Sequence, residues 1–231
     1  MPDTTILIVD DEPQITRVLR SALESHGWKA RVAADGESAW DLFNAYKFDL
    51  VITDLSMPVV DGLELCRRIR KFSPLPIIVL SVKGEEKTKV QALDSGADDY
   101  VTKPFGMEEL TARVRAQLRR ISAQAVPNTG NTIEEGDFIV DQQRRRVTVR
   151  GEEVRLTPKE YDLLLFFLAH PERVLTHKSI LAAVWGDHSA HQGEYLRVFV
   201  GQLRKKLEVD PTSPQYIKTE PWVGYRFQPG A

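Results

Sequence analysis

The sequence predicts a doubly wound α/β domain with a five-stranded parallel sheet, followed by a smaller α+β domain with a helix-turn-helix core. The chain has 231 residues, which is too long for one typical small domain and sufficient for two. Apolar runs alternate with amphipathic stretches over residues 1–121, and residues 122–133 are then mostly small and polar, as in a linker. Beyond the linker, residues 134–231 change to short strands, three helices and a final hairpin.

Five apolar runs predict the strands of the first domain. The third and fourth runs are continuously apolar over most of their length, as expected of strands buried on both faces. In the first interval between runs, Pro13 can occupy the first turn of a helix and Gly27 can end it. Because each run is followed by a helical pattern, we expect parallel strands joined by right-handed crossovers. The five runs are residues 6–9, 31–33, 50–53, 77–80 and 100–102.

The second domain is predicted to place three helices between short strands. Residues 157–160 form a capping-box pattern with proline at the first helical position, which begins the first helix. Thr176 can cap the second helix and Gly186 can end it, and the third runs from about residue 194 to residue 207. The strands are predicted at residues 138–140, 146–149, 154–156, 216–219 and 225–227.

The composition excludes several classes of protein. The single cysteine, Cys66, rules out an intramolecular disulfide framework and a thiolate zinc site, and it fits a reducing compartment. No stretch approaches the roughly 18 apolar residues of a membrane span, and the N-terminus lacks a signal pattern, so we expect a cytoplasmic protein without membrane association. The 31 basic and 33 acidic residues give a net charge of -2, so the whole chain lacks the basic balance of a nucleic-acid binder.

Polar residues at the ends of the predicted strands form the first candidate site. The carboxyl ends of the strands in a doubly wound sheet meet at one edge, where ligands bind. Three carboxylates there repel one another unless a cation joins them, and oxygen ligands suit Mg²⁺. A lysine and a hydroxyl beside the metal would suit a phosphoryl group. Any single member is ordinarily a helix cap or a solvated side chain, and the complete set favours function: Asp10, Asp11, Asp54, Ser81 and Lys103.

Residues 5 to about 121 resemble the receiver domain of bacterial two-component response regulators. The resemblance implies that Asp54 accepts a phosphoryl group from a phosphohistidine on a partner sensor kinase. Lys103 would pair with the phosphoryl oxygens. A cis Lys103-Pro104 peptide bond would orient the lysine side chain toward them. The resemblance rests on the combination of 9–12 (Val-Asp-Asp-Glu), 54–58 (Asp-Leu-Ser-Met-Pro), 61–62 (Asp-Gly), 96–100 (Gly-Ala-Asp-Asp-Tyr) and 103–105 (Lys-Pro-Phe).

The same resemblance implies a metal site and a switch. Asp11, Asp54 and the backbone carbonyl of Ser56 would bind Mg²⁺, and Asp10 would act through a metal-bound water. Ser81 would move toward the phosphoryl group by hydrogen bonding to it. Tyr100 would then rotate into the vacated space, which couples a local charge change to a bistable element.

Charged residues of the fourth helix, fifth strand and fifth helix are candidates for a dimer interface. Solvated helix faces are the commoner meaning of such charges. In the subfamily named below, matching positions form intermolecular ion pairs across a symmetric dimer, which implies pairs of Lys89 with Glu109 and of Asp99 with Arg113. The full set is Lys89, Asp94, Asp98, Asp99, Glu109, Arg113, Arg115 and Arg120.

The third helix of the second domain is the candidate DNA-reading element. Its apolar residues fall at helical spacing, and residues 195–207 contain four basic residues and no acidic one. A helix with one buried and one basic side can enter a major groove, although an ordinary amphipathic surface helix has the same pattern. The two capped helices before it and the terminal hairpin favour the DNA-reading interpretation. The residues expected to meet DNA are Arg197, Gly201, Arg204 and Lys205.

Residues of about 134–229 resemble the winged-helix effector domain of the OmpR/PhoB subfamily, and within it the potassium-responsive regulators. Many relatives carry Arg-Gly in the wing where this chain has Pro221-Trp222. Trp222 could therefore pack against the protein or contact the DNA backbone, and the sequence leaves both open. The resemblance rests on 156–161 (Leu-Thr-Pro-Lys-Glu-Tyr), 174–176 (Val-Leu-Thr), 184–186 (Val-Trp-Gly), 203–207 (Leu-Arg-Lys-Lys-Leu) and 224–227 (Gly-Tyr-Arg-Phe).

Together these resemblances imply a phosphoacceptor transcription factor rather than an enzyme. Its partners would be a sensor histidine kinase, a direct-repeat DNA operator and a second copy of the chain, with RNA polymerase as a further candidate. The regulated genes would serve potassium transport. One alternative is a regulator that binds DNA without phosphorylation, the receiver being structural. Another is a phosphatase of the haloacid-dehalogenase type, which needs a second aspartate where this chain has Ser56.

Overall fold

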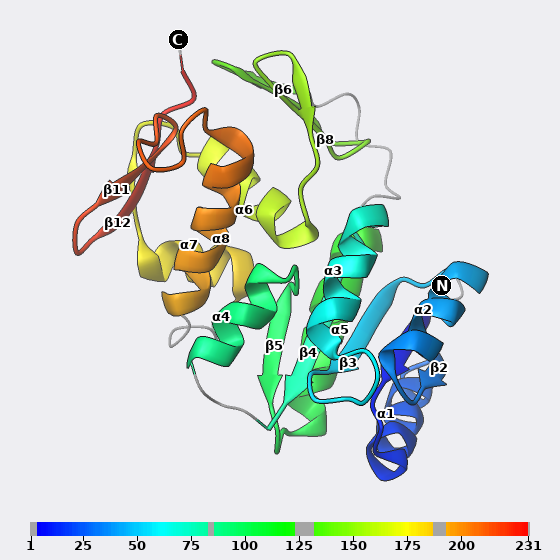
Figure 1. The fold of residues 1–231 in the computed structure, drawn as a ribbon. Helices are drawn as coiled ribbons and strands as arrows, with labels where there is room; N and C mark the ends of the chain where they lie inside the picture. The colour runs from blue at the N-terminus through cyan, green and yellow to red at the C-terminus, as the bar shows by residue number, and fades with distance from the viewer. Residues whose placement is uncertain (1–3, 83–85, 123–131, 187–192, 231) are drawn as a thin grey trace. The chain divides into compact units, whose positions relative to one another are not determined.

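The computed structural model describes residues 4–82, 86–122, 132–186 and 193–230, without the side chains of 119–122 and 193–194. Two compact units divide the chain, Met1–Ala125 and Val126–Ala231 (Figure 1). Regular structure overlaps both ends of the predicted linker, because a helix continues to Ser122 and a strand begins at Thr132. No helix among the described residues is both long enough and apolar enough to cross a membrane.

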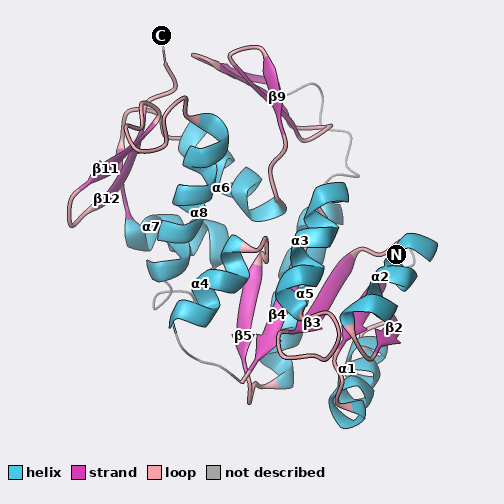
Figure 2. Ribbon diagram, viewed as in Figure 1, coloured by secondary structure: helices cyan, strands magenta, loops and turns pink. Residues whose placement is uncertain are grey.

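The first unit contains the predicted five-stranded parallel sheet, in the order β2-β1-β3-β4-β5 (Figure 2). The strands are β1 Thr5–Val9, β2 Lys29–Ala33, β3 Leu50–Asp54, β4 Ile77–Ser81 and β5 Asp99–Thr102. The helices between and after them are α1 Pro13–Ser25, α2 Gly36–Ala45, α3 Gly62–Phe72, α4 Glu86–Asp94 and α5 Met107–Ser122. The order reverses at β1, so the crevice of a doubly wound sheet lies beyond the carboxyl ends of β1 and β3.

Continuous burial of the central strands explains why their sequences lack an alternating pattern. Every residue of β3 and β4 is buried, and helices cover both faces of the sheet. On one face, Leu19 and Leu23 of α1 and Leu110 and Val114 of α5 pack with the sheet in one core cluster. Burial of this apolar surface is the main force that holds the parallel strands together.

Local contacts at the starts of two helices place the ends of the strands. Asp35 caps α2 by accepting hydrogen bonds from the backbone N–H groups of Glu37 and Ser38 at 2.9 and 2.8 Å. Asp61 caps α3 in the same way. A Cβ atom on Gly62 would lie 2.1 Å from the carbonyl oxygen of Asp54, so only glycine allows α3 to start so close to the end of β3.

The second unit is the predicted α+β domain. A four-stranded antiparallel sheet, β6-β7-β8-β9, precedes three helices, and a three-stranded sheet in the order β10-β12-β11 completes it. The helices are α6 Pro158–Leu168, α7 His177–Trp185 and α8 Gly193–Leu207. The strands are β6 Thr132–Glu135, β7 Phe138–Asp141, β8 Arg146–Val149, β9 Glu152–Val154, β10 Val174–Thr176, β11 Ile217–Glu220 and β12 Gly224–Phe227.

Two strands of the second unit were not predicted, and one is displaced. β6 is amphipathic and short, and β10 is a three-residue strand whose only partner is β12, so neither has a strong local signal. β9 lies two residues before its predicted position at 154–156. The predicted capping box of α6 is confirmed, because Thr157 and Glu160 each accept a hydrogen bond from the other's backbone N–H.

Aromatic rings join the two sheets of the second unit around one core. Phe138 of β7 lies edge-to-face with Tyr216 and Phe227, with ring centroids 4.8 and 5.1 Å apart. Phe227 also stacks on Phe167 of α6 at 5.7 Å. The terminal hairpin is therefore fixed to the first strands and to the helices by buried rings, which add geometric preference to their burial.

Candidate functional site

The carboxyl edge of the first sheet brings together most of the predicted pocket. Asp54 is the last residue of β3, Ser81 is the last residue of β4, and Asp10 follows β1 directly. All three are buried, although each is polar. Buried polar groups require partners, and these lie at the same edge of the sheet.

Lys103 is the cation that joins the buried carboxylates. Its Nζ lies 2.8 Å from Asp10 Oδ2 and 3.0 Å from Asp54 Oδ1, and 3.6 Å from Glu12 Oε1. Burial alone would lower the pKa of Lys103, but the hydrogen bonds to Asp10 and Asp54 outweigh it and hold the pKa above its ordinary value. Lys103 is therefore charged at neutral pH.

The backbone around Lys103 fixes where its side chain begins. The Lys103-Pro104 peptide bond is cis, as the sequence resemblance predicts. The backbone N–H of Lys103 donates a 2.7 Å hydrogen bond to the carbonyl oxygen of Ser81. The lysine is thus tied to the end of the neighbouring strand β4.

Asp10 and Asp54 each use their second oxygen on a nearby backbone N–H. Asp10 Oδ1 accepts from Glu12 at 2.9 Å, and Asp54 Oδ2 accepts from Ser56 at 2.8 Å. Burial raises the pKa of Asp10, and the nearby Asp54 carboxylate also raises it, while Lys103 acts in the opposite direction. Burial is the largest of these causes, because removal from water disfavours the charged form of the carboxyl group.

The predicted metal ligands only partly converge. Asp11 is exposed, and among the described residues no three acidic, histidine or cysteine side chains are arranged to hold a metal. The donor chemistry nevertheless fits Mg²⁺, because carboxylate oxygens of Asp10 and Asp54 share one buried pocket. Asp11 would have to turn toward Asp54 to complete the set.

The predicted switch residues contact each other. Tyr100 is 2% exposed, and its hydroxyl is hydrogen-bonded to the Ser81 side chain. Burial raises the pKa of Tyr100, so the hydroxyl stays protonated. The expectation from the sequence is that the Tyr100 ring becomes buried only after phosphorylation. In this structure the ring is already buried.

Two of the residues predicted for the dimer interface already have ion-pair partners within the chain. Asp98 is fully buried and pairs with Arg70 of α3, so its side chain is not available to a second chain. Asp99 forms an ion pair with Arg113 of its own chain at 3.0 Å, and Arg113 also contacts Glu109 at 3.0 Å. Asp99 and Arg113 lie close enough in one chain to form this ion pair without a second chain.

The other predicted interface residues stay untested. Asp94, Glu109 and Arg115 are exposed, and Lys89 is half-buried. The side chain of Arg120 lies outside the described residues. The predicted intermolecular pair of Lys89 with Glu109 therefore stays a prediction.

Arg70 is a half-buried residue whose structural role was not predicted from the sequence. Its guanidinium donates to the carbonyl oxygens of Gly96 and Leu75 and pairs with Asp98, which also accepts from the backbone N–H of Ile77 at 2.9 Å. This network joins α3 to the start of β4 and to the loop between α4 and β5. An arginine on an amphipathic helix gives no local signal that its partner lies 28 positions away.

The predicted DNA-reading helix, α8, presents its residues in two different ways. Its apolar stripe is buried, as predicted, and Arg197 and Lys205 are exposed while Gly201 is half-buried. Arg204 instead binds the hairpin, because its guanidinium donates to the carbonyl oxygen of Ile217 at 2.6 and 3.1 Å and to Thr219 Oγ1 at 2.8 Å. Only part of the predicted DNA-contacting set is therefore free to contact DNA without rearrangement.

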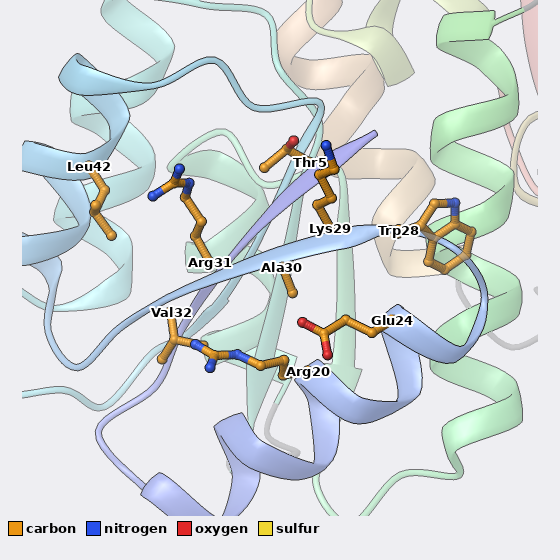
Figure 3. Close-up of a pocket in the computed structure, with 9 residues that line it drawn as sticks. All are labelled: Thr5, Arg20, Glu24, Trp28, Lys29, Ala30, Arg31, Val32 and Leu42. Atoms are coloured by element: carbon orange, nitrogen blue, oxygen red, sulfur yellow. The ribbon is translucent and has the colours of Figure 1, made fainter. Parts of the chain in front are cut away.

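A separate open groove of about 910 Å³ runs along the edge strand β2. Its lining residues come from α1, β2 and α2, with Arg20 and Glu24 on the α1 side (Figure 3). Lys29 and Arg31 place charges along this edge, which is a common protection of an edge strand against pairing with another chain. None of the predicted site residues lines this groove.

Comparisons with known proteins match both units. Residues 6–115 match the response regulator receiver domain, and residues 151–227 match the C-terminal domain of transcriptional regulatory proteins. The chain is 44% identical over 224 residues to the KDP operon transcriptional regulatory protein KdpE of Escherichia coli K12, covering 97% of this chain and 99% of the relative. It is 42% identical over 225 residues to KdpE of Mycobacterium tuberculosis, with the same coverage.

Solved structures agree with this assignment. The response regulator DrrB of Thermotoga maritima, described as an OmpR/PhoB homologue, is similar with a TM-score of 0.52 and 30% identity, over 98% of this chain and 99% of that one. A two-component response regulator of Clostridium difficile matches 52% of this chain and 98% of its own, with a TM-score of 0.51 and 34% identity. The order of the two domains and the identity over nearly the whole length show that this chain belongs to the OmpR/PhoB family of two-component response regulators.

Proposed function

We propose that Asp54 accepts a phosphoryl group from a phosphohistidine of a sensor kinase. The observation that carries the proposal is the position of Lys103 Nζ, within 3.0 Å of both Asp54 and Asp10 at the crevice of the sheet. In the transfer, a carboxylate oxygen of Asp54 forms the new bond to phosphorus while the bond from phosphorus to the histidine nitrogen breaks. Negative charge then lies on the phosphoryl oxygens, and Lys103 is placed to neutralise it.

Receiver domains use Mg²⁺ for this chemistry, and the residues here that would hold it are Asp11, Asp54 and the carbonyl of Ser56, with Asp10 acting through a water. When bound, the ion supplies charge neutralisation between the carboxylate and the incoming phosphoryl group. The position of the Asp10 and Asp54 carboxylates in one buried pocket supports this assignment, because oxygen ligands of this kind suit Mg²⁺.

Ser81 and Tyr100 are proposed to transmit the effect of phosphorylation from the pocket to β5. A phosphoryl group on Asp54 offers Ser81 a charged acceptor, which is stronger than the neutral Tyr100 hydroxyl that it now contacts. Loss of that hydrogen bond changes the position or mobility of Tyr100 at β5, beside the Asp99 and Arg113 pair. The proposed outcome is a homodimer with higher affinity for DNA.

The regulated genes are proposed to serve potassium transport. The support is that relatives 42–44% identical over 97% of the chain are named KdpE, and that one of them is named for the KDP operon. Selecting bound fragments from the genome of the host and identifying the adjacent genes tests this assignment. Recovery of fragments only from genes unrelated to potassium transport would contradict it.

Treatment with a small phosphodonor and Mg²⁺ tests the phosphoacceptor proposal. We expect the intact mass to rise by one phosphoryl group, and the rise to be absent in Asp54→Ala and present in the control Asp61→Ala. Dimer formation and DNA affinity should increase in parallel with the mass. An unchanged mass, with DNA binding that is the same in both proteins, would instead favour the phosphorylation-independent regulator.

The same reaction separates the proposed function from a phosphatase. A phosphoacceptor retains one phosphoryl group per chain for a time, whereas a phosphatase releases many phosphate ions per chain. The haloacid-dehalogenase mechanism needs a carboxylate two residues after the nucleophile, and Ser56 cannot act as that general acid. Multiple turnover of phosphate esters would revive that alternative.

A further inference from the structure

The edge strand β2 of the first sheet has no part in the proposed phosphoryl transfer. Among the described strands its only neighbour is β1. The open groove of about 910 Å³ runs along its other side, so within the described part of the chain neither a helix nor a loop covers this edge. An uncovered edge presents backbone N–H and C=O groups that can pair with a strand of another chain.

The backbone of β2 is regular over its whole length. Its five residues pair with the consecutive residues Thr5–Val9 of β1, so no bulge interrupts the strand, and the strand contains no proline. The N–H of Lys29 donates to the Thr4 carbonyl oxygen at 2.8 Å, on the side of β1. Because backbone groups alternate in direction along a strand, those of Ala30 and Val32 point away from β1, toward the groove.

The side chains of β2 divide this edge into a basic side and an apolar side. Lys29 and Arg31 are exposed on one side of the strand, and Ala30 and Val32 lie on the other, toward α1 (Figure 3). Ala30 and Val32 pack against the core cluster of the first domain. The two cations are two residues apart, which is the spacing of side chains on one face of a strand.

Helix α1 supplies the remaining charges of the groove. Arg20 and Glu24 line the groove from the side of α1 (Figure 3). Their charges are opposite, so the α1 side carries no net charge. The side of Lys29 and Arg31 carries two positive charges, and Glu24 is the one acidic residue among the described residues that line the groove.

The side chain of Arg31 is held by an aromatic ring. Its guanidinium carbon lies 3.6 Å from the centroid of the Tyr46 ring, which follows α2. A guanidinium group stacked on a ring still presents its N–H groups to a carboxylate in the plane of the group. Because the stacking already restricts the arginine, a carboxylate that binds it loses less free energy in ordering the side chain.

The charges of this edge restrict which strand can pair with it. Natural edge strands are protected by a covering element, a bulge, proline or charge, and of these β2 has only charge. Lys29 and Arg31 repel a basic strand, and an apolar strand would have to remove both from water. Opposite charges on paired strands attract each other, so carboxylates at alternate positions of an added strand match these two cations.

We propose that β2 and its groove bind an extended acidic segment of a partner protein, which adds a strand to the edge of the first sheet. Acidic side chains at every second position of the segment pair with Lys29 and Arg31, and small apolar side chains between them face Ala30 and Val32. Backbone hydrogen bonds to the two apolar residues supply affinity, and the alternation of charge supplies specificity. The site is separate from the Asp54 pocket, because none of the pocket residues lines the groove.

Three peptides test the proposal with the full-length chain by nuclear magnetic resonance. The probe is Val-Glu-Val-Glu-Val, and the controls are its isomer Glu-Glu-Val-Val-Val and the basic peptide Val-Lys-Val-Lys-Val, all flanked by glycine and serine. The probe should shift the amide signals of Ala30 and Val32 and slow their exchange with solvent. The isomer should bind severalfold more weakly, and the basic peptide should not bind. Unchanged signals at millimolar probe would overturn the proposal.

Methylation of the probe backbone separates strand addition from ion pairing alone. In an added strand, alternate N–H groups face β2 and the others face solvent. N-methylation of one alternate set should therefore abolish binding, and N-methylation of the other set should leave the affinity nearly unchanged. Equal binding by both methylated peptides would mean that the groove attracts carboxylates without adding a strand, which contradicts the proposal.

Reversal of one charge tests the basic side of the edge. Arg31→Glu should weaken binding of the probe by about tenfold or more, because an attraction becomes a repulsion, and should allow the basic peptide to bind. Arg17→Glu is the matched control, since Arg17 is also exposed but does not line the groove, and it should leave the affinity unchanged. If Arg31→Glu lowers the unfolding temperature, Lys29→Glu repeats the test without loss of the Tyr46 contact. Wild-type affinity in a folded charge-reversal variant would overturn the proposal.

Discussion

The carboxyl edge of the first sheet and the exposed side of α8 place charged residues in opposite ways. At the sheet edge, Asp10 and Asp54 are buried, and the ammonium group of Lys103 lies within 3.0 Å of both carboxylates. On α8, Arg197 and Lys205 are exposed, whereas Arg204 binds the carbonyl oxygen of the hairpin. The first arrangement suits one small charged group, whereas the second suits the extended negative charge of a polyanion.

The difference shows which sequence motifs predict the positions of side chains and which do not. The strand-end residues meet because a parallel sheet brings its carboxyl ends to one edge, whichever helices follow. The helix residues share only a face, and which of them stays free depends on what packs beside the helix. Four predictions test this contrast, in the order of their expected effects.

Lys103→Met should have the largest effect. It leaves two buried carboxylates without their cation, and breaking a buried ion pair in this way typically costs about 3–5 kcal/mol. Urea unfolding with and without Mg²⁺ measures the loss, and Mg²⁺ should restore more stability to the variant than to wild type. Phosphorylation of Asp54 should fall strongly as well. Equal stability of the variant and wild type at neutral pH would contradict the role of Lys103 as the compensating charge.

Arg70→Ala should come next, with a loss of about 3 kcal/mol in the free energy of unfolding of the first domain. The substitution leaves Asp98 buried without its ion-pair partner. Arg67→Ala is the matched control on the same helix, because its ion pair with Glu64 is exposed, and its stability should change little. Similar effects of both variants would mean that Asp98 is not the structural residue that its burial indicates.

Arg204→Ala and Lys205→Ala should separate structure from DNA contact on α8. Loss of the Arg204 hydrogen bonds to the hairpin should destabilise the second domain by about 1.5–3 kcal/mol. Lys205→Ala should leave the thermal midpoint unchanged, weaken DNA binding uniformly across sequences and lower the salt slope by about one. A lower thermal midpoint for Lys205→Ala than for Arg204→Ala would contradict this division of roles.

Asp10→Asn should have the smallest effect on stability, and its sign should depend on pH. The folded-state pKa of Asp10 is raised above the ordinary 3.8, so its contribution to stability is present below pH 3.8 and is lost as pH rises through the raised value. Asparagine does not titrate, so the variant should gain stability relative to wild type across that window. Thermal unfolding between pH 3 and pH 7 measures the difference. A relative gain at low pH rather than at high pH would reverse the assigned sign.

Most of the fold and the grouping of Asp10, Asp54, Ser81 and Lys103 at one sheet edge could be predicted because their signals are local or topological. Continuous apolar runs identify β3 and β4, and the capping box of Thr157 and Glu160 identifies the start of α6. The short strands β6 and β10 lack such a signal, since only pairing with a neighbour makes them strands. The partnership of Arg70 with Asp98 is equally invisible in sequence, because it joins residues far apart in the chain.

The sequence by itself determined the two domain types, the strand ends that carry Asp10, Asp54, Ser81 and Lys103, and the apolar stripe of α8. It did so because hydrophobic periodicity is a local pattern, and because a parallel sheet brings the carboxyl ends of its strands to one edge. Only the tertiary structure decided that Asp98 is buried, that Asp99 pairs within its own chain, that Arg204 holds the hairpin and that Trp222 is fully exposed. A charged or aromatic side chain has several possible partners, and the packing of distant elements selects among them.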